Sequence, residues 1–221
     1  LLKHLPHVML MDSLGSSEAL GLAASTSGGG QSAATAKFTA GPNAAVFTED
    51  GRRVAPGSGE RGLVAVGGHT PLGYYKDEEK TAKTFRIFEG KRWSVPGDWA
   101  TVEADGNITL LGRGSQVINT GGEKVFPEEV EEALKRFPGV RDAAVVGLPD
   151  PRFGERICAV VDVQGGAAPT LADLQAHVKS LLADYKVPRE LVLAEVVRAP
   201  NGKLDYKMVR AQAQAALGAK A

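Results

Sequence analysis

Three charged residues stand beside glycines in settings that suit contact with sugar or phosphate oxygens. Asp98 follows Gly97, and a carboxylate next to a glycine can approach a ribose closely and accept hydrogen bonds from both of its hydroxyls. Arg113 follows Gly112, and a planar guanidinium hydrogen-bonds such oxygens in a way that lysine cannot copy. Lys203 ends the turn Pro-Asn-Gly-Lys, where an ammonium on a flexible stem can stabilise a transient negative charge.

Each of these residues also has a plainer interpretation. A turn aspartate often caps its own loop, an exposed arginine often forms a surface ion pair, and a lysine after Asn-Gly is often only solvated. By residue type alone both interpretations stay open, and the order of the surrounding motifs bears on the choice between them. Between Asp98 and Lys203 come a hairpin signal at Asp105-Gly106, then Gly114-Ser115, Gly121-Gly122 and an acidic helix opened by Pro127.

A further group of small polar residues lies near the start of the chain. Gly15, Ser16, Ser17 and Glu18 follow the apolar run Val8–Met11, which we interpret as a buried strand with no preceding strand to pair with. Glycine and hydroxyl residues after such a strand predict a loop whose N–H groups can face an anion. A polar surface turn is the alternative interpretation of the same residues.

The order of these segments resembles the signature of the adenylate-forming superfamily, which includes acyl-CoA synthetases, luciferases and peptide-synthetase adenylation domains. The resemblance rests on the stretch 97–132 and on Pro200–Leu204, with weaker support from Gly15–Glu18 and from Gly73-Tyr74-Tyr75 before Thr81. It covers nearly the whole chain, but only the C-terminal part of such an enzyme. The run GRGSQVINTGGEKVFPEEVE is most similar to actinobacterial-type fatty-acyl-CoA synthetases, some of which act on bulky sterol side chains.

The resemblance implies a role for each charged residue and three bound species: ATP or AMP, Mg²⁺ and CoA. Asp98 would hold the ribose of AMP with Arg113 as its partner. Ser17 would contact phosphate, and Glu18 would help to hold Mg²⁺. Lys203 would be the catalytic residue, bridging the carboxylate substrate and the α-phosphate during adenylation.

Three further assignments follow from the same resemblance. Gly121 and Gly122 would lie near the channel for the pantetheine arm of CoA; a bulge between strands is the alternative. Ser115 would be the hinge about which the C-terminal domain rotates between adenylation and thioester formation, although the family usually has Asp or Lys there. Leu14 replaces the aromatic residue that lies beside adenine in the family.

The function implied is that of the C-terminal part of an ATP-dependent fatty-acyl-CoA synthetase. Such an enzyme uses a carboxylic acid, ATP and CoA as small-molecule substrates. The family's phosphate-binding loop, S/T-G-S/T-T-G-x-P-K, does not occur in this sequence, and neither does the large N-terminal region that would wall the acyl pocket. We therefore expect the chain to be inactive without a separate N-terminal domain. The alternatives are a truncated, non-catalytic module that binds a nucleotide or a protein, and, less favoured, a peptide-synthetase adenylation domain.

The elements that must position these residues change character along the chain. Residues 44–113 contain short apolar segments between Gly and Pro, typical of a small antiparallel barrel or sheet. The predicted strands are Ala44–Thr48, Gly62–Val66, Trp93–Val95, Trp99–Glu103 and Asn107–Leu111, and the Ser/Gly/Ala-rich stretch Ser25–Ala36 is predicted to be a loop.

The second half alternates strand and helix patterns. Helices are predicted at Pro127–Phe137, at Leu171–Leu182 with Thr170 and Asp173 as its cap, and at Asp205–Ala216. Strands are predicted at Asp142–Gly147, Glu155–Val163 and Leu191–Val197. We therefore expect an α+β protein: residues 1–114, an antiparallel β-barrel or sheet ending the large adenylation domain, and residues 115–221, a compact mobile C-terminal domain with a small sheet and flanking helices.

The composition is that of an ordinary globular protein and excludes several classes. Lys+Arg and Asp+Glu both number 26, which gives no general attraction to nucleic acid or anionic membranes. No apolar run approaches the roughly 20 residues of a membrane span. One cysteine, Cys158, excludes an intrachain disulfide framework and suits a reducing, cytoplasmic location. The first residues show neither an initiator Met nor a signal peptide, and we interpret the chain as beginning inside a domain.

Overall fold

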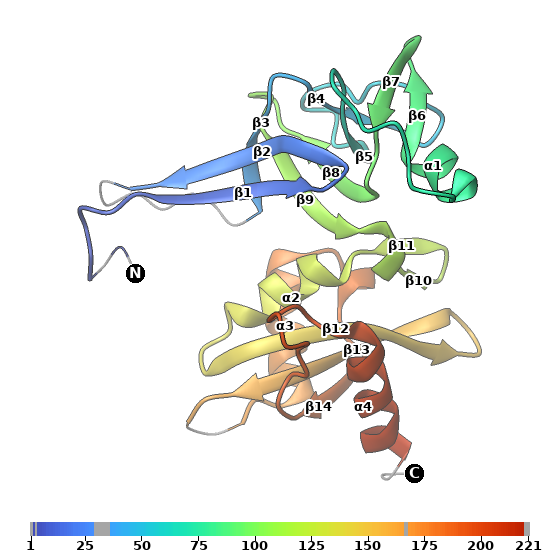
Figure 1. The fold of residues 1–221 in the computed structure, drawn as a ribbon. Helices are drawn as coiled ribbons and strands as arrows, with labels where there is room; N and C mark the ends of the chain where they lie inside the picture. Colours follow the sequence, from blue (N-terminus) through green and yellow to red (C-terminus); the bar gives the residue numbers. More distant parts are fainter. Residues whose placement is uncertain (1, 3, 29–35, 166–167, 219–221) are drawn as a thin grey trace. The chain divides into compact units, whose positions relative to one another are not determined.

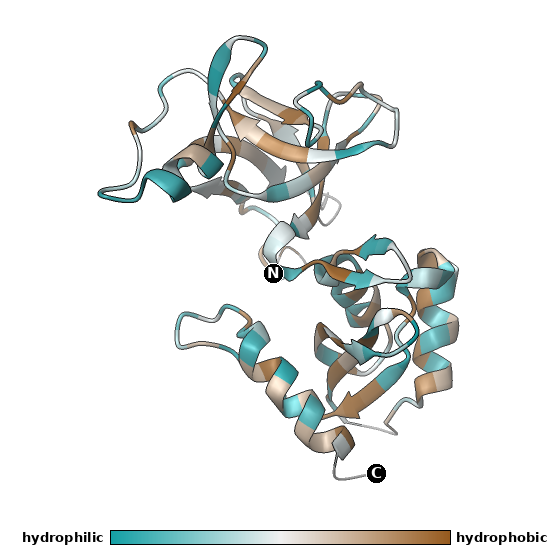
Figure 2. Ribbon diagram, turned by 90° about the vertical axis from the view of Figure 1, so that its right-hand side faces the viewer, coloured by the Kyte–Doolittle hydropathy of each residue, from teal (hydrophilic) through white to brown (hydrophobic). Residues whose placement is uncertain are grey.

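A computed structural model describes residues 2, 4–28, 36–165 and 168–218 of the 221-residue chain. Contacts divide the chain into two compact units, Leu1–Gly114 and Ser115–Ala221. The architecture is α+β, with a large antiparallel sheet in the first unit and a smaller mixed sheet with helices in the second (Figure 1). Apolar residues concentrate in the strands of both units (Figure 2).

The first unit is a nine-stranded sheet with one short helix. Its strands pair in the order β1-β2-β3-β9-β8-β5-β7-β6, with β4 beside β5, and every pairing is antiparallel. The described strands do not close into a barrel, so the sheet form of the prediction holds. Its elements are β1 Leu10–Ser16, β2 Ala19–Ser27, β3 Lys37–Ala40, β4 Ala44–Phe47, β5 Arg61–Val66, α1 Glu78–Thr84, β6 Phe85–Phe88, β7 Lys91–Ser94, β8 Asp98–Val102 and β9 Ile108–Arg113.

The start of the chain differs from its prediction. The run Val8–Met11 is not a buried strand, because Met9 and Met11 are 72% and 69% exposed. The strand begins at Leu10 and forms a hairpin with β2. Of the four residues predicted as a loop after it, Gly15 and Ser16 end β1, and Ser17 and Glu18 form the turn to β2. Ser25–Ser27, predicted as loop, end that strand, and positions 29–35 lie outside the described residues.

The second unit places helices on both faces of a five-stranded sheet. β12 (Val140–Asp150) and β13 (Gly154–Val163) form a long antiparallel hairpin, and β14 (Glu190–Leu193) pairs with β13 in parallel. β10 (Ile118–Thr120) pairs with β11 (Glu123–Val125) and meets the first residue of β13, Gly154, through Thr120. The remaining elements are η1 Gly114–Gln116, α2 Pro127–Lys135, α3 Leu171–Leu181, η2 Asp184–Lys186 and α4 Tyr206–Gly218.

Strict alternation along β12 builds the core of the second unit. Ala143 and Val145 pack with α2 and α3 on one face, whereas Ala144 and Val146 pack with α4 on the other. Successive strand residues point to opposite faces, so a strand buried on both sides reads as the continuous apolar run seen in the sequence. The predicted helices and strands of this half are present, each within a few residues of its predicted bounds.

Candidate functional site

The tight turn between β1 and β2 carries two of the predicted binding residues. Ser16 pairs with Ala19 across the hairpin, which leaves Ser17 and Glu18 as the two turn residues. Ser17 is exposed and Glu18 is half-buried. The Glu18 carboxylate accepts a hydrogen bond from the Tyr74 hydroxyl, a contact that spans 56 positions of the sequence. The turn is therefore tied to a distant loop.

The loop of Tyr74 is itself braced on helix α1. The Tyr74 N–H donates to Thr81 Oγ1 at 2.8 Å, and the Lys80 ammonium lies 3.9 Å from the centroid of the Tyr74 ring. A Cβ on Gly73 would come within 2.7 Å of the Thr81 side chain, so only glycine lets the loop approach the helix this closely. Tyr74 was missed as a site residue. The Gly-Tyr-Tyr and Thr-Ala pattern was the signal that pointed to this loop.

The hydrogen bond from Tyr74 sets the charge of Glu18. The Tyr74 hydroxyl is the largest influence that lowers the pKa of Glu18 below its ordinary value. Burial, reinforced by the neighbouring Glu18, raises the pKa of the Tyr74 hydroxyl. The pair is thus an ionised carboxylate and a neutral phenol at neutral pH. The carboxylate keeps further lone pairs for a cation or another donor.

Asp98 and Arg113 face each other across two neighbouring strands. They are directly paired in the β8–β9 register, with Arg113 Nε 3.5 Å from Asp98 Oδ1. The side chain of Asp98 is 17% exposed and that of Arg113 is 57% exposed. The Gly114 N–H donates to the Gly97 carbonyl at 3.0 Å, which joins the ends of the two strands. The pair therefore stands on a fixed backbone, with the guanidinium toward solvent.

The pKa of Asp98 is raised, whereas that of Glu18 is lowered. Desolvation raises the pKa of Asp98, the charge of Arg113 counteracts it, and the charge of Glu18 adds to the rise. The charge of Glu18 therefore acts on Asp98, although the two residues are 80 positions apart in the sequence. The structure thus brings the predicted residues Glu18, Asp98 and Arg113 into one region of the first unit.

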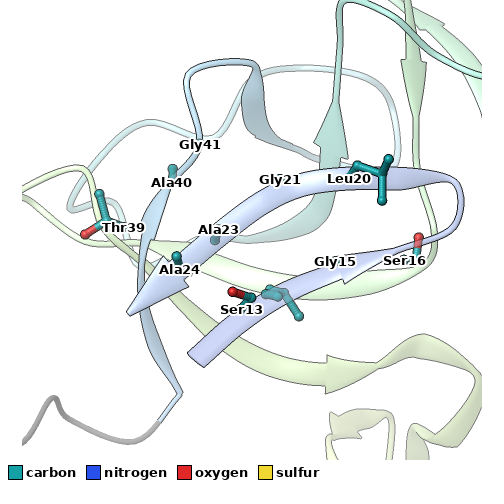
Figure 3. A pocket seen from close by; sticks show the side chains of 11 residues that line it. Ser13, Gly15, Ser16, Leu20, Gly21, Ala23, Ala24, Thr39, Ala40 and Gly41 are labelled. Carbon is teal, nitrogen blue, oxygen red and sulfur yellow. The ribbon is translucent and has the colours of Figure 1, made fainter. Parts of the chain in front are cut away.

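A cavity of about 670 Å³ adjoins the β1–β2 turn (Figure 3). Figure 3 shows its wall as the hairpin β1–β2 and the neighbouring strand β3. Glycine, alanine and serine make up most of the wall, so backbone and short side chains leave the space open. The lining residues are Ser13, Leu14, Gly15, Ser16, Leu20, Gly21, Ala23, Ala24, Thr39, Ala40 and Gly41.

The two predicted glycines of the second unit form the turn between β10 and β11. Gly121 and Gly122 have φ angles of 60° and 87°, the left-handed conformation that a two-residue hairpin turn requires. They are turn residues and not a bulge. The Gly121 N–H donates to the Phe153 carbonyl at 2.9 Å. The guanidinium of Arg189 lies 3.9 Å from the centroid of the Phe153 ring, so an aromatic ring and a cation stand beside the turn.

Lys203 ends a turn that backbone hydrogen bonds close. The Ala199 N–H donates to the Lys203 carbonyl at 2.8 Å, and the Gly202 N–H donates to the Ala199 carbonyl at 2.8 Å. The Lys203 N–H donates to the Asn201 side chain. Lys203 itself is exposed, and no residue in the described part of the chain pairs with its ammonium. Hydrogen bonds therefore hold the backbone of the turn, whereas the Lys203 side chain is exposed to solvent.

Ser115 is exposed, lies in η1 and is the first residue of the second unit. A Cβ on the preceding Gly114 would meet Trp99 Nε1 at 2.7 Å, which accounts for the glycine there. The predicted site residues are thus divided between the two units: Ser17, Glu18, Asp98 and Arg113 lie in the first, and Ser115, Gly121, Gly122 and Lys203 lie in the second. Among the described residues no three His, Cys, Asp or Glu side chains gather as a metal site.

Comparisons with known proteins give a consistent result. Residues 129–203 match the model of the AMP-binding enzyme C-terminal domain. The chain is 53% identical to the medium/long-chain-fatty-acid and 3-oxocholest-4-en-26-oate CoA ligase of Mycolicibacterium smegmatis. The matching region covers 95% of this chain and 38% of that ligase. It therefore spans about two fifths of the length of this curated relative. No helix among the described residues is both long and apolar enough to cross a membrane.

Two solved structures have the same fold. One is a variant of the amide bond synthetase McbA from Marinactinospora thermotolerans, with a TM-score of 0.76 and 31% sequence identity. The superposed region covers 91% of this chain and 42% of the McbA chain. The o-succinylbenzoate CoA synthetase of Bacillus subtilis, in complex with its acyl-adenylate intermediate, matches 77% of this chain with 34% of its own, at a TM-score of 0.66 and 27% identity.

Proposed function

The chain belongs to the adenylate-forming ligases, carrying their AMP-binding enzyme C-terminal domain at residues 129–203, and from this premise we propose that it is the C-terminal part of an ATP-dependent fatty-acyl-CoA synthetase. In the complete reaction a carboxylate attacks the α-phosphorus of ATP and expels pyrophosphate. The CoA thiol then attacks the acyl carbon of the acyl-adenylate and expels AMP. The observation that carries the proposal is Lys203, whose ammonium has no partner among the described residues and whose turn, at the end of the matched segment, is closed by backbone hydrogen bonds.

In this proposal the carboxylates of the first unit hold the nucleotide. Asp98 accepts hydrogen bonds from the ribose hydroxyls and Arg113 donates to ribose or phosphate oxygens; their cross-strand pairing supports a joint role. Ser17 donates to phosphate from its exposed turn position. Glu18 fits Mg²⁺, which is commonly held by one or two carboxylates together with substrate phosphates. Bound Mg²⁺ supplies charge neutralisation of the phosphates.

The residues of the second unit serve the two chemical steps. Lys203 stabilises the negative charge shared by the substrate carboxylate and the α-phosphate. The Gly121-Gly122 turn admits the pantetheine arm of CoA, because glycines leave the backbone accessible. Arg189 beside Phe153 adds a cation and an aromatic face next to that turn. Ser115 is the hinge, since it starts the second unit after a glycine.

The acyl substrate that the chain fits best is a long-chain or sterol side-chain acid. In this proposal the cavity beside the β1–β2 turn forms one wall of the acyl site; its small residues, together with Leu14 and Leu20, leave room for a bulky apolar group. The relative from Mycolicibacterium smegmatis is named for medium and long-chain fatty acids and for 3-oxocholest-4-en-26-oate. Leu14, in place of an aromatic residue, lines this cavity.

The test is carboxylate-dependent ATP–pyrophosphate exchange, measured for the 221-residue chain alone and for the chain joined behind the N-terminal portion of the Mycolicibacterium smegmatis relative. We expect no exchange from the chain alone, because it lacks the family's phosphate-binding loop. The joined protein should exchange with long-chain and sterol acids. Lys203→Ala should lower that exchange by about 10²–10³-fold, the cost of one preorganised donor.

Lys207→Ala is the matched control, because Lys207 is another exposed lysine four positions away. Equal exchange in the Lys203→Ala and unsubstituted joined proteins would contradict the role of Lys203. Exchange by the chain alone would overturn the proposal that it needs an N-terminal domain. A joined protein without exchange, together with nucleotide binding by the chain alone, would favour the non-catalytic binding module instead.

A further inference from the structure

One arginine ties the turn of Lys203 to the centre of the second unit. Arg198 lies just before the turn, opposite Leu204 in an isolated pair of bridged residues. Its Nε and Nη2 donate to the two carboxylate oxygens of Asp142, at 2.8 and 2.9 Å. Its Nη1 donates to the carbonyl of Gly202 at 2.8 Å. A single planar guanidinium therefore links strand β12 to the peptide that joins Gly202 to Lys203.

The bond to Gly202 distinguishes this arrangement from an ordinary surface ion pair. Gly202 has a φ angle of 80°, and glycine has the widest choice of backbone conformations. The peptide before Lys203 is therefore the part of the turn that is least restrained by its own residue type. Its carbonyl points to the guanidinium, whose fork geometry is rigid, and this contact restricts the rotation of that peptide.

Asp142, which accepts two hydrogen bonds from Arg198, is itself held in place by the backbone. Its Oδ1 also accepts the N–H of Ala143, at 2.9 Å, and its side chain is 21% exposed, compared with 38% for Arg198. Ala143 and Ala144 follow it in the buried run of β12. The chain of contacts thus runs from the core strand through Asp142 and Arg198 to the backbone at Lys203.

We propose that Arg198 is a positioning residue that sets where the Lys203 ammonium is presented during adenylation. The inference rests on the proposed function of Lys203. Arg198 acts through the Gly202 carbonyl and needs no contact with the substrate. Catalytic power depends steeply on such placement, since a displacement of about 1 Å can cost about 10²-fold in rate.

The first test follows amide hydrogen exchange at Ala199 and Gly202, whose N–H groups close the turn, in the 221-residue chain. Arg198→Lys keeps the charge but cannot reach both acceptors with a fork. We expect these amides to exchange about tenfold faster, as for the loss of one hydrogen bond. Amides of β12 and β13 report whether the fold is intact. Unchanged exchange in the turn would overturn the inference.

Arg141→Lys is the matched control for this experiment. Arg141 is the neighbour of Asp142 on β12 and pairs with Asp162 through Nε at 3.0 Å, also as an arginine–aspartate pair. Among the described residues its hydrogen bonds go to Asp162 and not to the turn. The substitution should therefore leave exchange at Ala199 and Gly202 unchanged, whereas a general effect of weakening an ion pair on β12 would raise exchange in both variants.

The second test measures the two half-reactions in the joined protein. Arg198→Lys should lower kcat for adenylation by about 10- to 10²-fold with little change in the KM for ATP, because a misplaced group loses transition-state stabilisation. Thioester formation from acyl-adenylate and CoA should be unchanged, and Arg141→Lys should affect neither step. Full activity of Arg198→Lys in a protein that Lys203→Ala impairs would overturn the inference. If Lys203→Ala leaves adenylation unchanged, the proposed function fails. Amide hydrogen exchange still decides, in that case, whether Arg198 holds the turn.

Discussion

The pKa values of two carboxylates of the first unit are shifted in opposite directions by their surroundings. Glu18 is stabilised as an anion by a donated hydrogen bond, whereas Asp98 is disfavoured as an anion by burial. A binding site can use this difference, because a ligand that donates hydrogen bonds to Asp98 replaces the lost solvation. In the proposed function, the ribose hydroxyls supply those donors.

The state of Glu18 leads to a prediction for Tyr74→Phe. The substitution keeps the ring and its contact with Phe85 but removes the hydroxyl that donates to Glu18. The pKa of Glu18 should therefore rise toward its ordinary value, since the largest stabilisation of the anion is gone. A carboxyl-selective NMR titration of the chain measures this directly. The same titration curve for Glu18 in both proteins would show that the hydroxyl does not control its charge.

At the scale of elements, a buried glutamate joins helix α2 to the sheet and to α4. Glu131 is 3% exposed, and its carboxylate accepts the N–H of Val145 at 2.9 Å. The Tyr206 hydroxyl, at the start of α4, donates to its other oxygen at 3.3 Å. Burial raises the pKa of Glu131 to about 7. The acidic helix predicted from Pro127 thus contains one glutamate that faces the core.

This burial predicts how stability depends on pH. Below pH 4.5, the ordinary pKa of the group, Glu131 is protonated in both the folded and the unfolded chain. Between pH 4.5 and about 7 only the unfolded chain loses the proton, so the folded state becomes less stable, by about 3 kcal/mol in total. Glu131→Gln removes this loss. Urea unfolding at pH 4, 6 and 8 should show that the free energy of unfolding of the variant rises relative to that of the unsubstituted chain as the pH rises. A difference in free energy that does not change with pH would contradict the retention of a proton by Glu131 in the folded chain.

At the scale of the whole molecule, each unit has its own hydrophobic core. The clusters around Leu22 and Phe47 contain only residues of the first unit. The clusters around Leu134 and Val160 contain only residues of the second. A domain with its own core can unfold as a unit. We therefore expect the two units to unfold in separate transitions.

A pair of matched substitutions tests this separation. Leu134→Ala and Leu22→Ala both truncate a leucine that is 0% exposed, one in each unit. Each should cost about 2–5 kcal/mol through lost burial and a residual cavity. In calorimetry each variant should lower the midpoint of a different transition. If both lower the same transition, the chain unfolds as one cooperative body.

The α+β class, the three helices of the second unit and its strands β12, β13 and β14 follow from the sequence, whereas the short strands β10 and β11 and the short turns η1 and η2 were not predicted. The capping box of Thr170 and Asp173 opens α3 as predicted, and Pro127 begins α2. These elements are readable because their signals are local: caps, helix periodicity and buried runs involve residues a few positions apart. The motif that includes Asp98, Arg113 and Lys203 is likewise visible as residue types at fixed spacing.

Only the tertiary structure decided which distant residues meet. Strand register and the approach of separate loops determine three such contacts: the β1–β2 hairpin, the Tyr74–Glu18 hydrogen bond and the Arg198–Asp142 ion pair. A register shift of one residue turns every side chain to the other face, so such contacts leave no signal in a short window of sequence. The two carboxylates of the first unit show the consequence: their opposite pKa shifts come from a donor 56 positions away for Glu18 and from burial for Asp98.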